Sequence, residues 1–142
     1  MKVDFYVLES GGKQQAMLFA CELLEKIRDE NRRIHIHTAT REEATKLDTL
    51  LWTYREDSFL PHQLNDENPS PLTPITIGYS FQLPNNQDLL MNFDKDVPSF
   101  FNQFKQIIEI VIPDPSVQQL ARERYKQYRE KGCELNTHKI QR

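Results

Sequence analysis

The sequence has few cysteines and no long apolar run. Two cysteines among 142 residues, Cys21 and Cys133, are too few for a disulfide framework or a four-cysteine zinc site. No apolar run approaches the roughly 18 residues that a membrane-spanning helix needs. The opening ten residues lack the apolar centre and cleavage site of a signal peptide. We therefore expect a cytoplasmic protein that does not associate with membranes.

An excess of positive charge is also lacking, because the formal net charge is −3. Residues 116–142 nevertheless hold seven basic and three acidic residues, whereas residues 1–115 hold 11 basic and 18 acidic ones. Coating of nucleic acid requires a broad basic surface, which an acidic body does not offer. The pattern instead permits one local anion-binding site near the C-terminal end.

Glycine is scarce where phosphate-binding loops require it. A P-loop needs a glycine five positions before its Gly-Lys pair and Ser or Thr after it. Around Gly12 and Lys13 those places are held by Val7 and Gln14, and four glycines in the whole chain do not form a Gly-X-Gly-X-X-Gly fingerprint. We interpret Gly11-Gly12 as a strand-to-helix turn. A degenerate nucleotide-binding enzyme is the alternative interpretation.

The length and the order of elements predict one α/β domain over residues 1–142. Residues 3–8 and 33–38 have strand patterns, and residues 13–31 between them carry apolar side chains at helical spacing. A second helix is expected after Thr40, because Thr40-Arg-Glu-Glu43 has the spacing of a capping box. This order is typical of a mostly parallel sheet flanked by helices.

The second half of the chain predicts a long loop over residues 61–74, followed by strands and a final helix. The strands are expected at residues 75–79, 89–93 and 107–112, with a short helix at the phenylalanines of residues 100–104. A long helix should begin at Asp114-Pro115 and run to about Lys131, where Gly132 ends it.

No catalytic set, metal site or cofactor is predicted from the remaining motifs. His35 and His37 would face the same side of a strand, but no cysteine, histidine or carboxylate at ligand spacing completes a metal site. We expect both histidines to face solvent.

The last predicted helix carries two stripes of side chains. The first should pack onto the sheet and consists of Val117, Leu120, Ala121 and Tyr128. The second consists of Arg122, Tyr125, Lys126 and Arg129. Three cations and a tyrosine suit an acidic ligand with an apolar or aromatic element, and a solvated charged face is the alternative.

Two large apolar side chains stand near a connection in the first half of the chain. Trp52 ends the second predicted helix, and Phe59 follows in the segment Ser58-Phe-Leu-Pro-His62. Such residues either cover the edge of a core or anchor a partner.

These segments together carry a family resemblance. The sequence Leu-Ala-Arg-Glu-Arg-Tyr-Lys-Gln-Tyr-Arg over residues 120–129, followed by Leu-Asn-Thr over residues 135–137, resembles the C-terminal signature of the chi-subunit family of bacterial DNA polymerase III. Residues 46–52 and 58–62 are similar to the middle motif of that family. The resemblance covers essentially the whole chain in the same order.

The resemblance implies a non-enzymatic protein with a nucleotide-binding-like α/β fold and no cofactor. Members of the family link the psi subunit of the clamp loader to the acidic C-terminal tail of single-stranded DNA-binding protein, and they contact DNA only indirectly. A direct single-stranded nucleic-acid binder is a further alternative.

Carried over residue by residue, the tail site maps to Arg122, Tyr125, Lys126 and Arg129. The psi surface maps to Trp52 and Phe59, for which a helicase-type partner can compete. One position departs from the family pattern, because Gln118 stands where members can carry a lysine.

Overall fold

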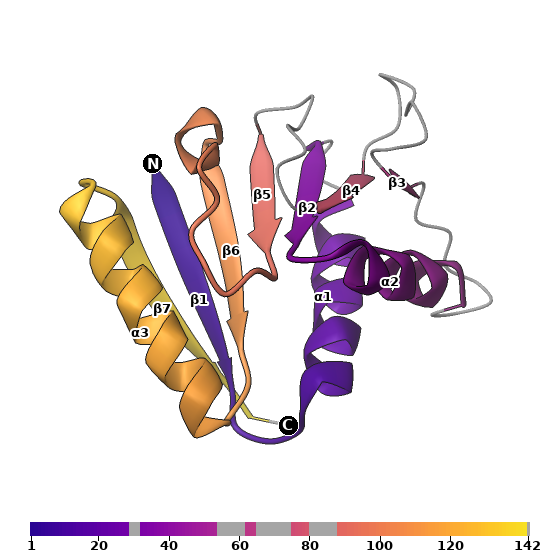
Figure 1. The fold of residues 1–142 in the computed structure, drawn as a ribbon, viewed down its shortest axis with the longest axis horizontal. Helices are drawn as coiled ribbons and strands as arrows, with labels where there is room; N and C mark the ends of the chain where they lie inside the picture. The colour runs from indigo at the N-terminus through magenta and orange to yellow at the C-terminus, as the bar shows by residue number, and fades with distance from the viewer. Residues whose placement is uncertain (29–31, 54–61, 65–74, 80–87, 142) are drawn as a thin grey trace.

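The described strands form one parallel sheet. The computed structural model describes residues 1–28, 32–53, 62–64, 75–79 and 88–141. Its sheet has the strand order β3-β4-β2-β5-β6-β1-β7, and every pair is parallel (Figure 1). The strands are β1 (Lys2–Leu8), β2 (Ile34–Thr38), β3 (His62–Leu64), β4 (Ile75–Tyr79), β5 (Leu89–Asn92), β6 (Gln106–Val111) and β7 (Glu134–Ile140). The predicted α/β fold with a mostly parallel sheet is confirmed.

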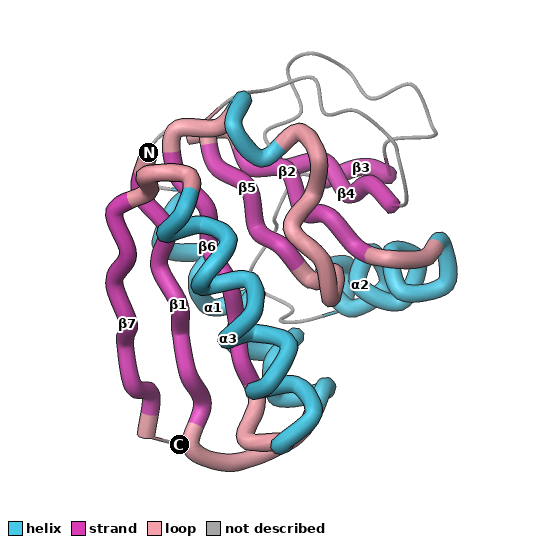
Figure 2. The backbone as a smooth tube through the Cα atoms, turned by 60° about the vertical axis from the view of Figure 1, so that its left-hand side comes forward, coloured by secondary structure: helices cyan, strands magenta, loops and turns pink. Residues whose placement is uncertain are grey.

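Helices cover both faces of this sheet. They are α1 (Lys13–Arg28), α2 (Arg41–Thr53), α3 (Pro115–Glu130) and the short 3-10 helix η2 (Phe101–Gln103). Buried side chains of α1 and α2 form one apolar cluster with one face of the sheet. Side chains of α3 and the phenylalanines around η2 form a second cluster with the other face. Figure 2 shows α3 lying across β1 and β6, with α1 behind the sheet.

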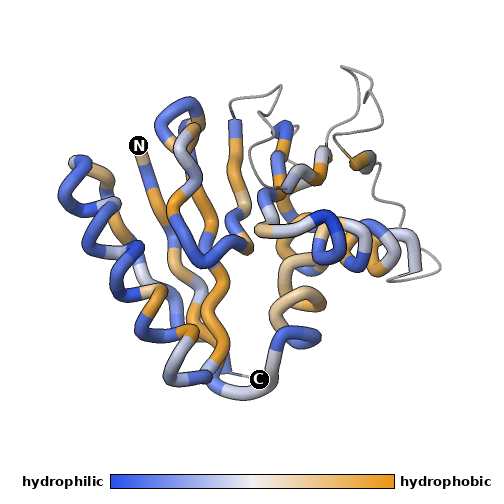
Figure 3. Tube along the Cα trace, in the orientation of Figure 1, coloured by the Kyte–Doolittle hydropathy of each residue, from blue (hydrophilic) through white to orange (hydrophobic). Residues whose placement is uncertain are grey.

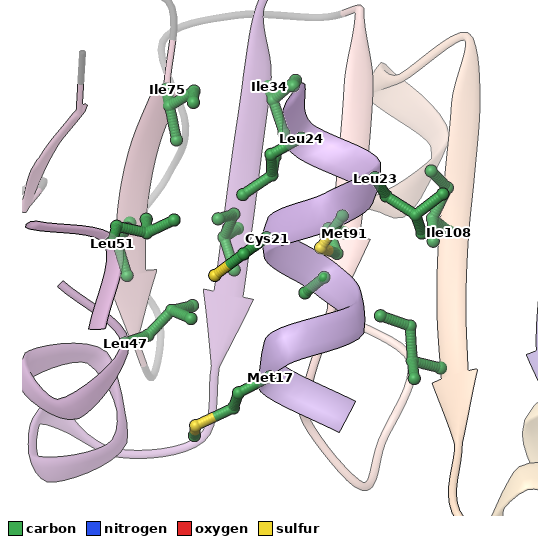
Figure 4. Packing of buried hydrophobic residues seen from close by; sticks show 14 of the residues in the cluster. Met17, Cys21, Leu23, Leu24, Ile34, Leu47, Leu51, Ile75, Met91 and Ile108 are labelled. Carbon is green, nitrogen blue, oxygen red and sulfur yellow. The ribbon is translucent and has the colours of Figure 1, made fainter. Parts of the chain in front are cut away.

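The larger cluster is built on the apolar stripe of α1. Cys21 and Leu24 are fully buried, and Figure 4 shows Leu24 beside Ile34 of β2 and Cys21 pointing toward Leu47 and Leu51 of α2. Burial of such side chains contributes roughly 1.5–3 kcal/mol each. Cys21 is therefore a small core residue, and burial raises the pKa of its thiol to about 12.

The predicted helix signals lie where the helices begin and end. Before α2, the Thr40 hydroxyl accepts a hydrogen bond from the Glu43 backbone N–H at 3.2 Å. At the start of α3, the Asp114 carboxylate accepts from the backbone N–H groups of Ser116 and Val117. Gly132 follows α3 with a φ of 83°, a conformation that favours glycine.

The structure completes or corrects the predicted sheet in three places. The two strands predicted first are parallel, as expected, and β6 and β5 lie between them in the sheet. The predicted loop over residues 61–74 contains the short strand β3, and its residues 61 and 65–74 lie outside the described residues. The edge strand β7 was not predicted, because its sequence alternates too weakly to indicate a strand.

The expectation that His35 and His37 face solvent is wrong. Both are buried in the central strand β2, with 0% and 2% of their surface exposed. His35 Nδ1 lies 2.7 Å from the Thr76 hydroxyl, and its ring packs on Phe104. Burial, assisted by the neighbouring His37, lowers the pKa of His35 to about 3.

We expect His35 to make folding sensitive to acid. The unfolded chain takes up its proton near pH 6.5, whereas the folded protein resists protonation down to about pH 3. Stability is therefore fully present above pH 6.5 and falls as the pH falls, by about 2 kcal/mol at pH 5 from this residue. Denaturant unfolding at several pH values should show that the free energy of unfolding of His35→Gln falls less steeply with falling pH than that of the parent. Equal slopes would contradict this prediction.

Candidate functional site

A cavity of about 380 Å³ lies between α3 and the sheet. Its floor is formed by Phe5 and Val7 of β1, Val111 of β6 and Thr137 of β7. The predicted second stripe of α3 lines the same cavity, through Arg122, Tyr125, Lys126 and Arg129, and Gln118 and Ala121 complete it. Figure 3 shows the contrast between the largely hydrophilic α3 and the hydrophobic strands. The structure thus brings all four predicted tail-site residues to one cavity.

The charged and apolar parts of this cavity are separated. Arg122, Lys126 and Arg129 are exposed on α3, whereas Tyr125 is half-buried and its ring centroid lies 5.4 Å from that of Phe5. The aromatic pair thus offers an apolar surface beneath the cationic side chains. A ligand that carries both an anion and an apolar or aromatic group fits this arrangement, because guanidinium groups pair with carboxylates through two parallel hydrogen bonds.

The third arginine of α3, Arg124, is buried and pairs with a carboxylate of the sheet. Arg124 is 5% exposed, and its Nε lies 3.1 Å from Oε1 of the fully buried Glu109. Arg124 Nη1 also donates to the Lys95 carbonyl at 2.9 Å. Oε2 of Glu109 accepts from Asn92 Nδ2 at 2.9 Å and from the Tyr128 hydroxyl at 2.7 Å. Arg124 therefore anchors α3 to β6 and does not line the cavity.

Burial sets the protonation of this network. Desolvation raises the pKa of Glu109, while the Arg124 guanidinium and the hydrogen bonds from Asn92 and Tyr128 oppose the rise. Desolvation and the neighbouring Glu109 also raise the pKa of Tyr128, so its phenol stays protonated and donates. A buried charge of this kind depends on its partners for stability.

The turn before α1 is occupied by its own side chains. The Gly12 backbone N–H donates to Gln15 Oε1 at 2.7 Å, so it is engaged where a phosphate loop would present it to a ligand. Gly11 has a φ of 97°, and a Cβ there would lie 2.5 Å from Gln15 Cγ. Lys13 Nζ pairs with Glu43 at 2.9 Å. These contacts agree with the interpretation of Gly11-Gly12 as a structural turn.

The second predicted surface lies on α2. Trp52 is 55% exposed, whereas its neighbour Leu51 is buried in the core. Phe59 lies outside the described residues. Because α2 and α3 pack on opposite faces of the sheet, Trp52 and the α3 cavity lie on opposite sides of the molecule.

None of the described helices is long and apolar enough to span a membrane. Within residues 1–28, 32–53, 62–64, 75–79 and 88–141, no three His, Cys, Asp or Glu side chains gather as metal ligands would.

Comparison with known protein families shows to which family the chain belongs. The family described as "DNA polymerase III chi subunit, HolC" matches residues 1–136. The chain belongs to this family. Membership gives the protein a role in DNA replication.

Curated relatives of the chi family match along nearly their whole length. The DNA polymerase III subunit chi of Pseudomonas aeruginosa is 33% identical over 99% of this chain and 98% of its own. The subunit chi of Haemophilus influenzae is 32% identical over 96% of each chain. That of Escherichia coli is 30% identical over 94% of each chain.

The structure separates the arginines in the chi-like signature of residues 120–129. Arg122 and Arg129 line the cavity, whereas Arg124 is buried against Glu109. Helical spacing indicates the burial of Arg124, because Arg124 stands four residues before the buried Tyr128 and so shares its face of the helix.

The residues that form the cavity floor were not among the predicted site residues. Alternation along β1 places Phe5 and Val7 on one face, which is a usable signal. The contribution of Thr137 could not be found in this way, because β7 was not predicted as a strand.

Proposed function

We propose that this chi-family protein is a non-catalytic adaptor in DNA replication. It links the psi subunit of the clamp loader to the acidic C-terminal tail of single-stranded DNA-binding protein. The observation that carries the proposal is the α3 cavity, where exposed cations surround an apolar floor. The cavity, the exposed Trp52 and the family membership support this assignment over an enzymatic one.

The tail of single-stranded DNA-binding protein is the proposed ligand of the α3 cavity. Arg122 is the best candidate to bind its terminal carboxylate, because a guanidinium pairs with both oxygens at once. Tyr125 and the floor would contact the terminal phenylalanine ring. Lys126 and Arg129 would meet the acidic residues that precede it.

The psi subunit is the proposed ligand of the surface that contains Trp52 and Phe59. A helicase-type partner would compete for the same surface. Since Trp52 and the cavity lie on opposite faces of the sheet, two partners can bind at the same time. Simultaneous binding raises the effective concentration of the clamp loader at the coated template without any catalytic step.

The test is assembly of a ternary complex. The full chain, purified psi subunit and the single-stranded DNA-binding protein should co-elute in gel filtration, and a variant of that protein without its tail should be lost from the complex. Binding of psi that displaces the tail would contradict the adaptor. Saturable ATP binding that Lys13→Ala abolishes would favour a nucleotide-dependent enzyme, and tight binding to bare single-stranded DNA would favour a direct nucleic-acid binder.

Replacement of Trp52 by Ala should weaken psi binding at least about tenfold. A buried aromatic anchor contributes about 2 kcal/mol or more to the binding free energy of an interface. Each increment of about 1.4 kcal/mol changes the dissociation constant tenfold. Calorimetric titration with psi measures the loss, and we expect a similar loss for Phe59→Ala. The matched control is Lys46→Ala, an exposed position on the same helix. Parent affinity in a folded Trp52→Ala protein would remove Trp52 from the psi surface.

A further inference from the structure

Lys139 lies on the same face of the sheet as the α3 cavity. Alternation along β7 divides its side chains between the two faces. Leu135 packs in the cluster beneath α3 and Thr137 lines the cavity, so Lys139, two residues further on, points to that face. Ile140 packs in the opposite cluster, as the alternation requires.

The strand register places Lys139 beside the cavity floor. Val111 of β6 pairs with Val7 of β1, and Val7 pairs with Lys139 of β7. Val7 and Val111 both line the cavity, so Lys139 extends the same row by one strand. Neighbouring strands lie roughly 4.8 Å apart, a distance that the flexible four-carbon stem of a lysine spans.

Lys139 and Gln118 belong to the same end of the cavity. Three residues separate the end of β6 from the start of α3, and the helix runs back along the sheet toward the start of β7 (Figures 1 and 2). Gln118 stands in its first turns, near the carboxyl ends of the strands, and Arg129 stands near the other end. Since Lys139 is the penultimate residue of β7, it lies level with Gln118 and far from Arg129 along the strand direction.

We propose that Lys139 supplies the positive charge at this end of the cavity, where the lining residue of α3 is the neutral Gln118. Its ligand is the terminal carboxylate of the acidic peptide, which Arg122, one turn after Gln118 on α3, would bind from the helix side. This inference rests on the proposed function, because it names a further binding residue for the same acidic tail. Cations then approach the peptide from the sheet edge as well as from α3.

Charge complementarity selects this occupant over an apolar partner. The row from Val111 to Lys139 passes from apolar floor to exposed cation across three neighbouring strands. A peptide that ends in an aromatic residue with a free carboxylate would place its ring on the apolar floor and its terminal charge toward Lys139. An exposed ion pair of this kind changes affinity by a small factor and is screened by salt.

The test measures binding of an acidic peptide with a free C-terminal phenylalanine to four forms of the full chain. These are the parent, Lys139→Gln, Gln118→Lys and the double variant. At low ionic strength, Lys139→Gln should weaken binding about threefold, and adding Gln118→Lys to it should restore affinity to within about twofold of the parent. Both effects should disappear with a peptide whose C-terminus is amidated.

Two controls separate this inference from the proposed function. Lys105→Gln removes the same charge near Asp88, at the start of β6, and should keep parent affinity. Arg122→Ala reports on the cavity itself. Failure of the peptide to bind the parent, or indifference to Arg122→Ala, would overturn the proposed function. Tight, Arg122-dependent binding that Lys139→Gln leaves unchanged would overturn only the role of Lys139.

Discussion

Replacement of Arg124 by Met is expected to lower the free energy of unfolding by about 3–5 kcal/mol, the usual cost of breaking a buried ion pair. The substitution leaves Glu109, which is fully buried, without the guanidinium 3.1 Å away. Hydrogen bonds from Asn92 and Tyr128 remain, but neither carries a compensating charge. Urea-induced unfolding of both proteins measures the difference.

The pH dependence of this loss identifies its cause. Without Arg124 the pKa of Glu109 rises further, so the folded variant favours the protonated acid. Its stability is then greatest below the ordinary pKa of glutamic acid and is lost as the pH rises through the folded value. The deficit relative to the parent should be larger at pH 7 than at pH 5.

Two further variants make the test of Arg124 specific. Adding Glu109→Gln to Arg124→Met removes the uncompensated charge and should recover part of the loss at pH 7. Arg129→Met, an exposed position on the same helix, should change stability by less than about 0.5 kcal/mol. A loss below about 1 kcal/mol for Arg124→Met would show that the pair does not anchor α3.

Replacement of Arg122 by Ala should weaken binding of the acidic tail by about 30-fold or more. The reason is that a terminal carboxylate in the cavity would lose its bidentate partner, at a cost on the order of 2 kcal/mol. Fluorescence anisotropy with a labelled tail peptide measures the change. A peptide with an amidated C-terminus should bind the parent weakly, and Arg122→Ala should weaken that binding little further.

The lysine of the same stripe provides the matched comparison. Lys126 is exposed and proposed to meet acidic residues at the rim, so Lys126→Ala should cost less than Arg122→Ala. Its effect should vanish at high salt, where the Debye length falls to about 3 Å at 1 M. Equal affinities for the parent, Arg122→Ala and Lys126→Ala, or affinity indifferent to salt, would mean that the stripe is a solvated face.

Local sequence signals determined most of the elements of this protein. The apolar stripe of α1, the Thr40 cap of α2 and the Asp114 cap of α3 depend on residues within a few positions of each other. The second stripe of α3 was also predictable, since spacing along one helix alone sets which side chains share a face. The interacting residues are close in sequence, so these features can be predicted from neighbouring residues alone.

Only the tertiary structure decided how these elements meet. Strands β5 and β6 lie between β1 and β2 because pairing across the sheet is fixed by contacts between residues distant in sequence. The same contacts bury His35 in the central strand and pair Arg124 with Glu109, whereas spacing along one segment cannot reveal either partner. They also place Thr137 of an unpredicted edge strand in the cavity. The stripe on α3 was determined locally, but the floor beneath it and Lys139 beside it follow from the parallel register of three strands.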